Sequence, residues 1–135
     1  MGRTGYVYRP AASSAVSGAV LVLHGSGGVA SDMFGLGFEA LADAGSFLTV
    51  YPEMLTPRAD EWGYLDDIPY FAALARRLQE PDFGVPADKI FICGHSAGGS
   101  MVTLLQNEMD EFAAAGVVEA AVGHRPGLPG AFKRP

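Results

Sequence analysis

A serine stands at the centre of the pentapeptide Gly-His-Ser-Ala-Gly, residues 94–98, where it could act as a nucleophile. Four apolar residues precede the pentapeptide and a helix-like segment follows it. This is the context of a sharp strand-to-helix turn that lifts a serine hydroxyl clear of a sheet. The pattern predicts that Ser96 attacks a carbonyl carbon in acyl-transfer chemistry. A glycine-rich turn with an idle serine is the plainer alternative.

A second glycine-rich turn, Gly-Ser-Gly-Gly at residues 25–28, also follows a short apolar run. Such a turn exposes backbone N–H groups, and one of them together with the amide of Ala97 could hold the oxyanion of a tetrahedral intermediate. Ser26 or Gly27 is the expected donor from this turn, and the sequence leaves both open. The two motifs together predict an oxyanion hole beside the serine.

The same turn satisfies a looser form of the dinucleotide-binding fingerprint through Gly25, Gly27 and Ala30. That motif requires an acidic residue about 20 positions further on, at the end of the next strand. Glu53 lies well beyond this spacing, and a histidine before the turn is no part of the motif. The spacing therefore favours an oxyanion turn over a nucleotide site, and we expect no cofactor.

The elements that must position these motifs begin with short apolar runs. The runs do not alternate polar with apolar residues, as a strand with one wet face would, so they suit a parallel sheet covered on both sides. A further edge strand is expected at residues 6–8. The four predicted buried strands cover residues 20–23, 47–51, 90–93 and 117–122.

Helix-like segments lie between these strands. The first begins at Ser31 or Asp32 and ends at Gly45, because side chains of these types cap helix starts and glycine ends helices. The second begins at Asp66 or Asp67, and the third runs from Ala97 to about residue 115. The expected core stripes of the three helices are Phe34, Phe38 and Leu41, then Phe71, Leu74 and Leu78, then Met101, Leu105, Met109 and Phe112.

Strands that alternate with helices predict a three-layer α/β fold, with a mostly parallel sheet and helices on both faces. A chain of 135 residues suffices for one hydrophobic core, and we expect residues 1–124 to form a single domain. Residues 125–135 hold three prolines and two glycines without periodicity, which predicts an irregular tail.

Composition limits the partners. The formal net charge of −6 argues against nucleic acid, since its binding depends on clustered Lys and Arg. The single cysteine, Cys93, rules out an internal disulfide and is expected to be a buried small hydrophobe. No apolar run is long enough to cross a bilayer, and no leader pattern is visible. We therefore expect a soluble protein without membrane contact, either cytoplasmic or secreted after its leader is removed.

A cluster of four acidic residues raises the question of a metal site. No histidine is spaced to join them, so a solvated loop and a helix cap are the favoured interpretation, and no metal is expected. The four residues are Asp60, Glu61, Asp66 and Asp67.

Taken together, residues 24–28, Trp62, "DDIPYFAALARRL" and "ADKIFICGHSAGGSM" resemble the α/β-hydrolase esterases of the polyhydroxybutyrate depolymerase and feruloyl esterase kind. The resemblance covers about residues 6–122. It implies hydrolysis of a small-molecule or polymeric carboxylic ester, Ser96 as the nucleophile, and an oxyanion hole shared between residues 25–28 and Ala97. It also implies structural roles for Trp62 and Asp67.

Three histidines are candidates for the base that takes the serine proton. Members of the family carry the catalytic acid and then the histidine on further strands, and this chain ends after its last predicted strand. The resemblance implies that His24 ties its loop down. His95 is expected to point into the fold, because neighbouring side chains diverge on a sharp turn. His124 follows the last predicted strand, and it is the base we predict because parallel strands end at one rim. Its alternative is a solvated residue at the start of a frayed tail.

A second function follows from the same features. Without its usual base, a serine hydrolase keeps only weak turnover, so the chain could instead serve as a binding or assembly domain. The strand predicted at residues 117–122 would leave an unpaired sheet edge, and such edges recruit other strands. The alternative prediction is therefore a homodimer joined through that edge.

Overall fold

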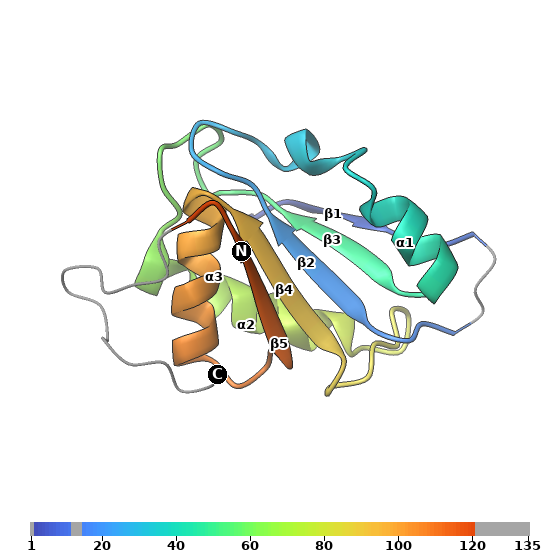
Figure 1. The fold of residues 1–135 in the computed structure, drawn as a ribbon. Coiled ribbons are helices and arrows are strands. Elements are labelled where there is room, and N and C mark those ends of the chain that lie inside the picture. The colour runs from blue at the N-terminus through green and yellow to red at the C-terminus, as the bar shows by residue number, and fades with distance from the viewer. Residues whose placement is uncertain (1, 12–14, 121–135) are drawn as a thin grey trace.

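The computed structural model describes residues 2–11 and 15–120, which form a five-stranded sheet with helices on both faces (Figure 1). The strands lie in the order β1-β3-β2-β4-β5 across the sheet. The elements are β1 (Gly5–Tyr8), β2 (Ala19–Leu23), the 3-10 helix η1 (Ala30–Met33), α1 (Phe38–Gly45), β3 (Leu48–Pro52), the 3-10 helix η2 (Tyr64–Asp67), α2 (Ile68–Leu78), β4 (Ile90–His95), α3 (Ala97–Glu108) and β5 (Ala114–Val118). This is the α/β architecture that the sequence predicts.

Strands β2 to β5 run parallel, and β1 pairs antiparallel with β3 at one edge. The predicted edge strand at residues 6–8 is therefore confirmed. β4 lies between β2 and β5, with Leu23 opposite Gly94 on one side and Val118 opposite His95 on the other. Because these strands are parallel, their carboxyl ends meet at one rim, where the residues that follow them come together.

Alternate residues of each strand face two different hydrophobic layers, as the two-residue repeat of a strand requires. Leu21 and Ile92 belong to the larger cluster, together with Phe71 of α2 and Leu105 of α3. Val22 lies between Leu21 and Leu23 in β2, so its side chain faces the other side of the sheet. There it packs in a smaller cluster with η1 and the start of α1. Helices α2 and α3 thus cover one face of the sheet, and η1 and α1 lie on the other (Figure 1).

The helix predicted over residues 31–45 is divided. The chain makes one turn of 3-10 helix in η1, then passes through Gly35 and Gly37 at φ values of 74° and 103° before α1 begins. These left-handed conformations are open to glycine and interrupt a helix. Phe34 and Leu41 are 42% and 61% exposed, so the predicted core stripe of this helix is wrong at these two positions, whereas Phe38 packs against the smaller cluster.

The third helix and the strand after it were predicted with wrong boundaries. α3 ends at Glu108, and β5 covers residues 114–118 instead of 117–122. The three alanines at residues 113–115 have a high helix propensity, but the pairing of Ala114 and Ala115 with β4 overrides that preference. Met109 and Phe112 are buried as predicted, although both lie in the connection rather than on the helix.

The second helix follows its prediction closely. α2 begins directly after Asp67 and accepts Pro69 in its first turn, where a missing N–H costs nothing. Phe71 and Leu78 are fully buried, and Leu74 packs against the same cluster. The sequence pattern therefore identified both the start and the buried face of this helix.

Two predictions concern residues outside those described, the tail at 125–135 and the base His124. Within the described parts of the chain, no helix is both long and apolar enough to cross a membrane.

Candidate active site

Ser96 occupies a strained turn between β4 and α3. Its φ of 55° and ψ of −120° are unusual for a residue with a side chain, and such strain concentrates at functional sites. The Ser96 N–H donates to the carbonyl of Val118 at 2.9 Å, which ties the turn to the end of β5. The order of strand, serine turn and helix that the motif predicts is present.

Two glycines let α3 cross the sheet closely. A methyl group added to Gly94 would lie 2.4 Å from the carbonyl carbon and oxygen of Gly98. A methyl group added to Gly98 would lie 2.4 Å from the carbonyl oxygen of Leu23. Real Cβ atoms essentially never approach backbone this closely. Both glycines are therefore required by the crossing.

The loop of residues 25–28 lies directly against the serine turn. A methyl group added to Gly25 would lie 3.2 Å from Cβ of Ser96. The Gly27 N–H donates to the carbonyl of Ala59 at 2.8 Å, and the Ser26 hydroxyl donates to the carbonyl of Asp60. The amide of Gly27 is thus engaged within the fold. The amide of Ala97 is in the first turn of α3, where N–H groups lack intrahelical acceptors.

His24 anchors the glycine loop. Its Nδ1 donates to the carbonyl of Gly25 at 3.0 Å, and its Nε2 lies 3.0 Å from Oε1 of Glu53. The ring is 1% exposed and lies 4.9 Å from the ring of Trp62, whose Nε1 donates to the His24 carbonyl at 3.0 Å. Both ring nitrogens therefore face groups of the fold, as expected for a residue that holds the loop. Glu53 also accepts the Ala30 N–H at 3.0 Å, so it serves the loop and is not free to bind a ribose.

His95 does not point into the fold, contrary to the prediction. Its side chain is 45% exposed, and its Nε2 lies 2.8 Å from Oε2 of Glu119. The alternation of β4 explains the difference, because Ile92 and Gly94 are buried toward α3 while Cys93 and His95 face the opposite side. Glu119 was missed as a site residue because it was placed within a longer strand.

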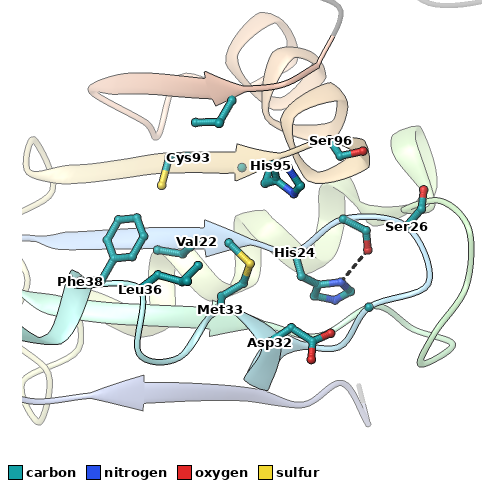
Figure 2. A pocket seen from close by; sticks show the side chains of 14 residues that line it. Val22, His24, Ser26, Asp32, Met33, Leu36, Phe38, Cys93, His95 and Ser96 are labelled. Carbon is teal, nitrogen blue, oxygen red and sulfur yellow. Dashed lines mark hydrogen bonds between the residues drawn. The ribbon is translucent and has the colours of Figure 1, made fainter.

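A pocket of about 520 Å³ joins these groups (Figure 2). Ser96, His95 and His24 lie toward one end of it, and Phe38 and Cys93 lie toward the other. The described lining residues are Val22, His24, Gly25, Ser26, Gly28, Asp32, Met33, Leu36, Phe38, Cys93, Gly94, His95, Ser96 and Val118. A polar end with a serine thus continues into an apolar trough.

Cys93 lines the apolar end of this pocket. Burial raises the pKa of its thiol to about 11, so the thiol stays protonated near neutral pH. A protonated thiol is a weak nucleophile and behaves as a small apolar group. The predicted role of Cys93 is consistent with this environment.

Asp67, one of the two residues predicted to begin the second helix, is buried and holds neighbouring parts of the fold together. It is 3% exposed, accepts the Gly63 N–H at 2.7 Å and pairs with Arg3 at 2.7 Å. Arg3 had no signal in the sequence, because its partner lies 64 positions away along the chain. Among the residues that the structure describes, no group of three or more His, Cys, Asp or Glu side chains could hold a metal ion.

No protein-family model and no curated protein matches the chain. Solved structures of esterases do share its fold. An acetyl xylan esterase from Aspergillus awamori has a TM-score of 0.75 at 20% identity, over 87% of this chain and 48% of that protein. A ferulic acid esterase from Anaeromyces mucronatus has a TM-score of 0.70 at 17% identity, over 90% of this chain and 53% of that protein. Esterase PE8 has a TM-score of 0.69 at 20% identity, over 87% and 66% of the two chains.

The chain therefore has the fold of the α/β hydrolases, and it spans about half the length of the first two of these esterases. At these identities the likeness concerns the fold. What the chain does must be argued from its own residues.

Proposed function

We propose that the chain hydrolyses carboxylic esters through an acyl-enzyme intermediate at Ser96. The observation that carries the proposal is the position of Ser96 on a strained turn, with the glycine loop packed against it at Gly25. Ser96 is partly buried, lines the pocket and directly precedes the first turn of α3, which is an arrangement that suits acyl transfer.

In the first step, the Ser96 oxygen bonds to the ester carbonyl carbon while its proton passes to a base. The carbonyl oxygen becomes an oxyanion, which accepts hydrogen bonds from the amides of Ala97 and Ser26. We favour Ser26 over Gly27 as the loop donor because the Gly27 amide is already bound to Ala59. Gly27 instead shapes the loop through its φ of 67°.

In the second step, the tetrahedral intermediate expels the alcohol, which takes the proton from the base. Water then attacks the acyl-enzyme, gives a proton to the base, and the acid leaves as the Ser96 oxygen recovers its proton. Each bond formed to the acyl carbon is thus matched by one that breaks, and neither metal nor cofactor takes part.

The substrate we propose is a small or polymeric ester with an apolar acyl group. The trough beyond Ser96 is lined by Val22, Met33, Phe38 and Cys93, which can shield an acyl chain from water. The fold neighbours whose names state acetyl xylan esterase and ferulic acid esterase support ester chemistry in general.

The test compares hydrolysis of p-nitrophenyl acetate and butyrate by the wild type, Ser96→Ala and Ser100→Ala. Ser100→Ala removes the same hydroxyl group one turn further along α3, and Ser100 is not among the described residues that line the pocket. We expect Ser96→Ala to abolish turnover and Ser100→Ala to retain it. A fluorophosphonate should add its mass to the wild type and not to Ser96→Ala. Equal hydrolysis by wild type and Ser96→Ala would exclude the proposal.

A second candidate function is self-assembly by a catalytically weak hydrolase. β5 pairs with β4 on one side, and no other described strand pairs with its outer side. Most of its residues are exposed, and Val118 is 54% exposed. An open edge of this kind can pair with the same edge of a second copy. Light scattering after size exclusion should then show a dimer whose share rises with concentration, and a monomer at all concentrations would count against it.

A further inference from the structure

We propose that His95, oriented by Glu119, is the general base that activates Ser96 in this chain. The inference rests on the proposed esterase function and adds to it the residue that removes the proton. His95 then acts on the reacting hydroxyl, and Glu119 is a positioning residue that acts through His95.

The first support is the way the sheet directs the ring. His95 is the last residue of β4, and strand alternation places it on the pocket side together with Cys93. His95 and Ser96 both line the same pocket, and Figure 2 shows the two side chains adjacent at its polar end. The base and the nucleophile therefore share one solvent-accessible space.

The second support is the environment of the ring nitrogens. Nε2 of His95 is 2.8 Å from Oε2 of Glu119, and a carboxylate can only accept, so Nε2 carries the proton. Nδ1 then carries the lone pair that a base needs. The carboxylate also stabilises the imidazolium that forms when the ring takes a proton.

The third support is where Nδ1 lies. A methyl group added to Gly25 would be 3.6 Å from Nδ1 of His95 and 3.2 Å from Cβ of Ser96. Both atoms thus border the small space left by the missing side chain of Gly25. Figure 2 shows the Ser96 hydroxyl directed away from the ring. Rotation about the Cα–Cβ bond, which is fast for an accessible side chain, or one bridging water connects it to Nδ1.

The fourth support is a backbone hydrogen bond between the serine turn and the end of β5. The Ser96 N–H binds the carbonyl of Val118, the residue directly before Glu119. Glu119 itself has a φ of 52°, which turns the chain as it leaves β5. The serine turn thus fixes the end of β5, and the end of β5 places the carboxylate on the ring.

The other histidine of the described pocket does not fit this role. His24 is 1% exposed, and its Nδ1 and Nε2 face the carbonyl of Gly25 and the carboxylate of Glu53. Both nitrogens are thus directed at groups that hold the loop, and the ring is closed off from solvent. His95 is therefore the described imidazole that combines access, an acceptor nitrogen and a carboxylate partner.

The proposed step balances as a proton transfer. The Ser96 proton moves to Nδ1 of His95 as the oxygen bonds to the carbonyl carbon, and it moves on to the alcohol oxygen as the C–O bond breaks. Removing a general base of this kind costs about 10²-fold or more in rate. Because Glu119 and His95 are both substantially exposed, water screens their interaction, and we expect Glu119→Gln to cost about 10-fold or less.

The experiment follows covalent modification of Ser96 by a fluorophosphonate with intact mass spectrometry, in the wild type, His95→Ala and His124→Ala. We expect His95→Ala to slow the modification by about 10²-fold and the control Ser100→Ala to leave it unchanged, while His124→Ala tests the alternative base. Added imidazole should restore much of the rate to His95→Ala, because it supplies the missing base. Ser96→Ala measures modification at other residues. Melting followed by the fluorescence of Trp62 checks folding, and His95→Gln replaces His95→Ala if the latter does not fold.

Glu119 gives a second readout that a merely structural role would not produce. If Glu119 acts only through His95, the double variant His95→Ala/Glu119→Gln should be as slow as His95→Ala and should recover equally with imidazole. A further loss in the double variant would contradict the positioning role.

The outcomes separate this inference from the function on which it rests. Fast modification of Ser96 in His95→Ala, with loss in His124→Ala, would overturn the assignment of the base while leaving the esterase proposal intact. A wild type that shows no Ser96-dependent modification or hydrolysis would overturn both.

Discussion

Replacing Gly98 with alanine should destabilise the fold, because the added methyl group meets backbone atoms on the sheet. The new Cβ would lie 2.4 Å from the carbonyl oxygen of Leu23 and 2.6 Å from that of His24, where ordinary contacts begin at 3.4 Å. Both obstacles are backbone atoms at the end of the central strand β2, so α3 must move away by about 1 Å, a gap that forfeits about a quarter to a half of each dispersion contact.

The cost follows from what α3 buries against the sheet. Met101, Val102 and Leu105 are fully buried, and each contributes about 2 kcal/mol to the free energy of unfolding. Losing a quarter to a half of the combined total of about 6 kcal/mol amounts to about 1.5–3 kcal/mol, partly offset by up to about 1 kcal/mol from the better helix propensity of alanine. We expect a net loss of about 2 kcal/mol, within the range for overpacked cores.

The assay is urea unfolding followed by the fluorescence of Trp62, which is 2% exposed and binds the His24 carbonyl. The matched control is Gly116→Ala, since a Cβ there would meet Cβ of Cys93 at an ordinary 3.4 Å. Gly116→Ala should change the free energy of unfolding by less than about 1 kcal/mol. If both variants unfold at the same urea concentration, the close crossing of α3 over β2 is refuted.

Three further predictions concern charge, reactivity and the loop. Asp67→Ala should destabilise the fold by about 3 kcal/mol, because it leaves Arg3 unpaired in a buried place, whereas Asp82→Asn at the exposed pair with Arg77 should change urea unfolding little. Cys93 should react slowly with iodoacetamide at pH 8 and faster as the pH rises toward its pKa of about 11; rapid reaction at pH 8 would contradict the burial of the thiol. Trp62→Phe should cost about 1–2 kcal/mol in urea unfolding followed by circular dichroism, since the His24 carbonyl loses its donor, and an unchanged stability would show that this bond contributes nothing.

The sequence predicted the parts of this fold whose signals are local. Short apolar runs predict the central strands, and Gly94 and Gly98 on either side of Ser96 predict the serine turn. The central strands β2, β3 and β4 were therefore found within about two residues of their ends. The start of α2 was found for the same reason, since Asp67 and Pro69 mark it directly.

The errors arose where two local preferences compete. Residues 113–115 are three alanines, which favour a helix, yet two of them pair with β4 in β5. Phe34 and Leu41 have helical spacing, but Gly35 and Gly37 turn the chain between them. In both places the tertiary arrangement decides the outcome, and no property of the local sequence states which preference prevails.

The misplaced strand also explains why the proposed base was missed. A strand over residues 117–122 would place Glu119 within the edge strand of the sheet, and not beyond the end of that strand beside His95. In the structure β5 ends at Val118, opposite His95, so Glu119 is the first residue beyond the rim and meets the ring of His95. A shift of three residues at the start of this strand and four at its end thus places Glu119 beside His95. The contact between His95 and Glu119 depends on the register between β4 and β5, and that register is a property of the folded chain.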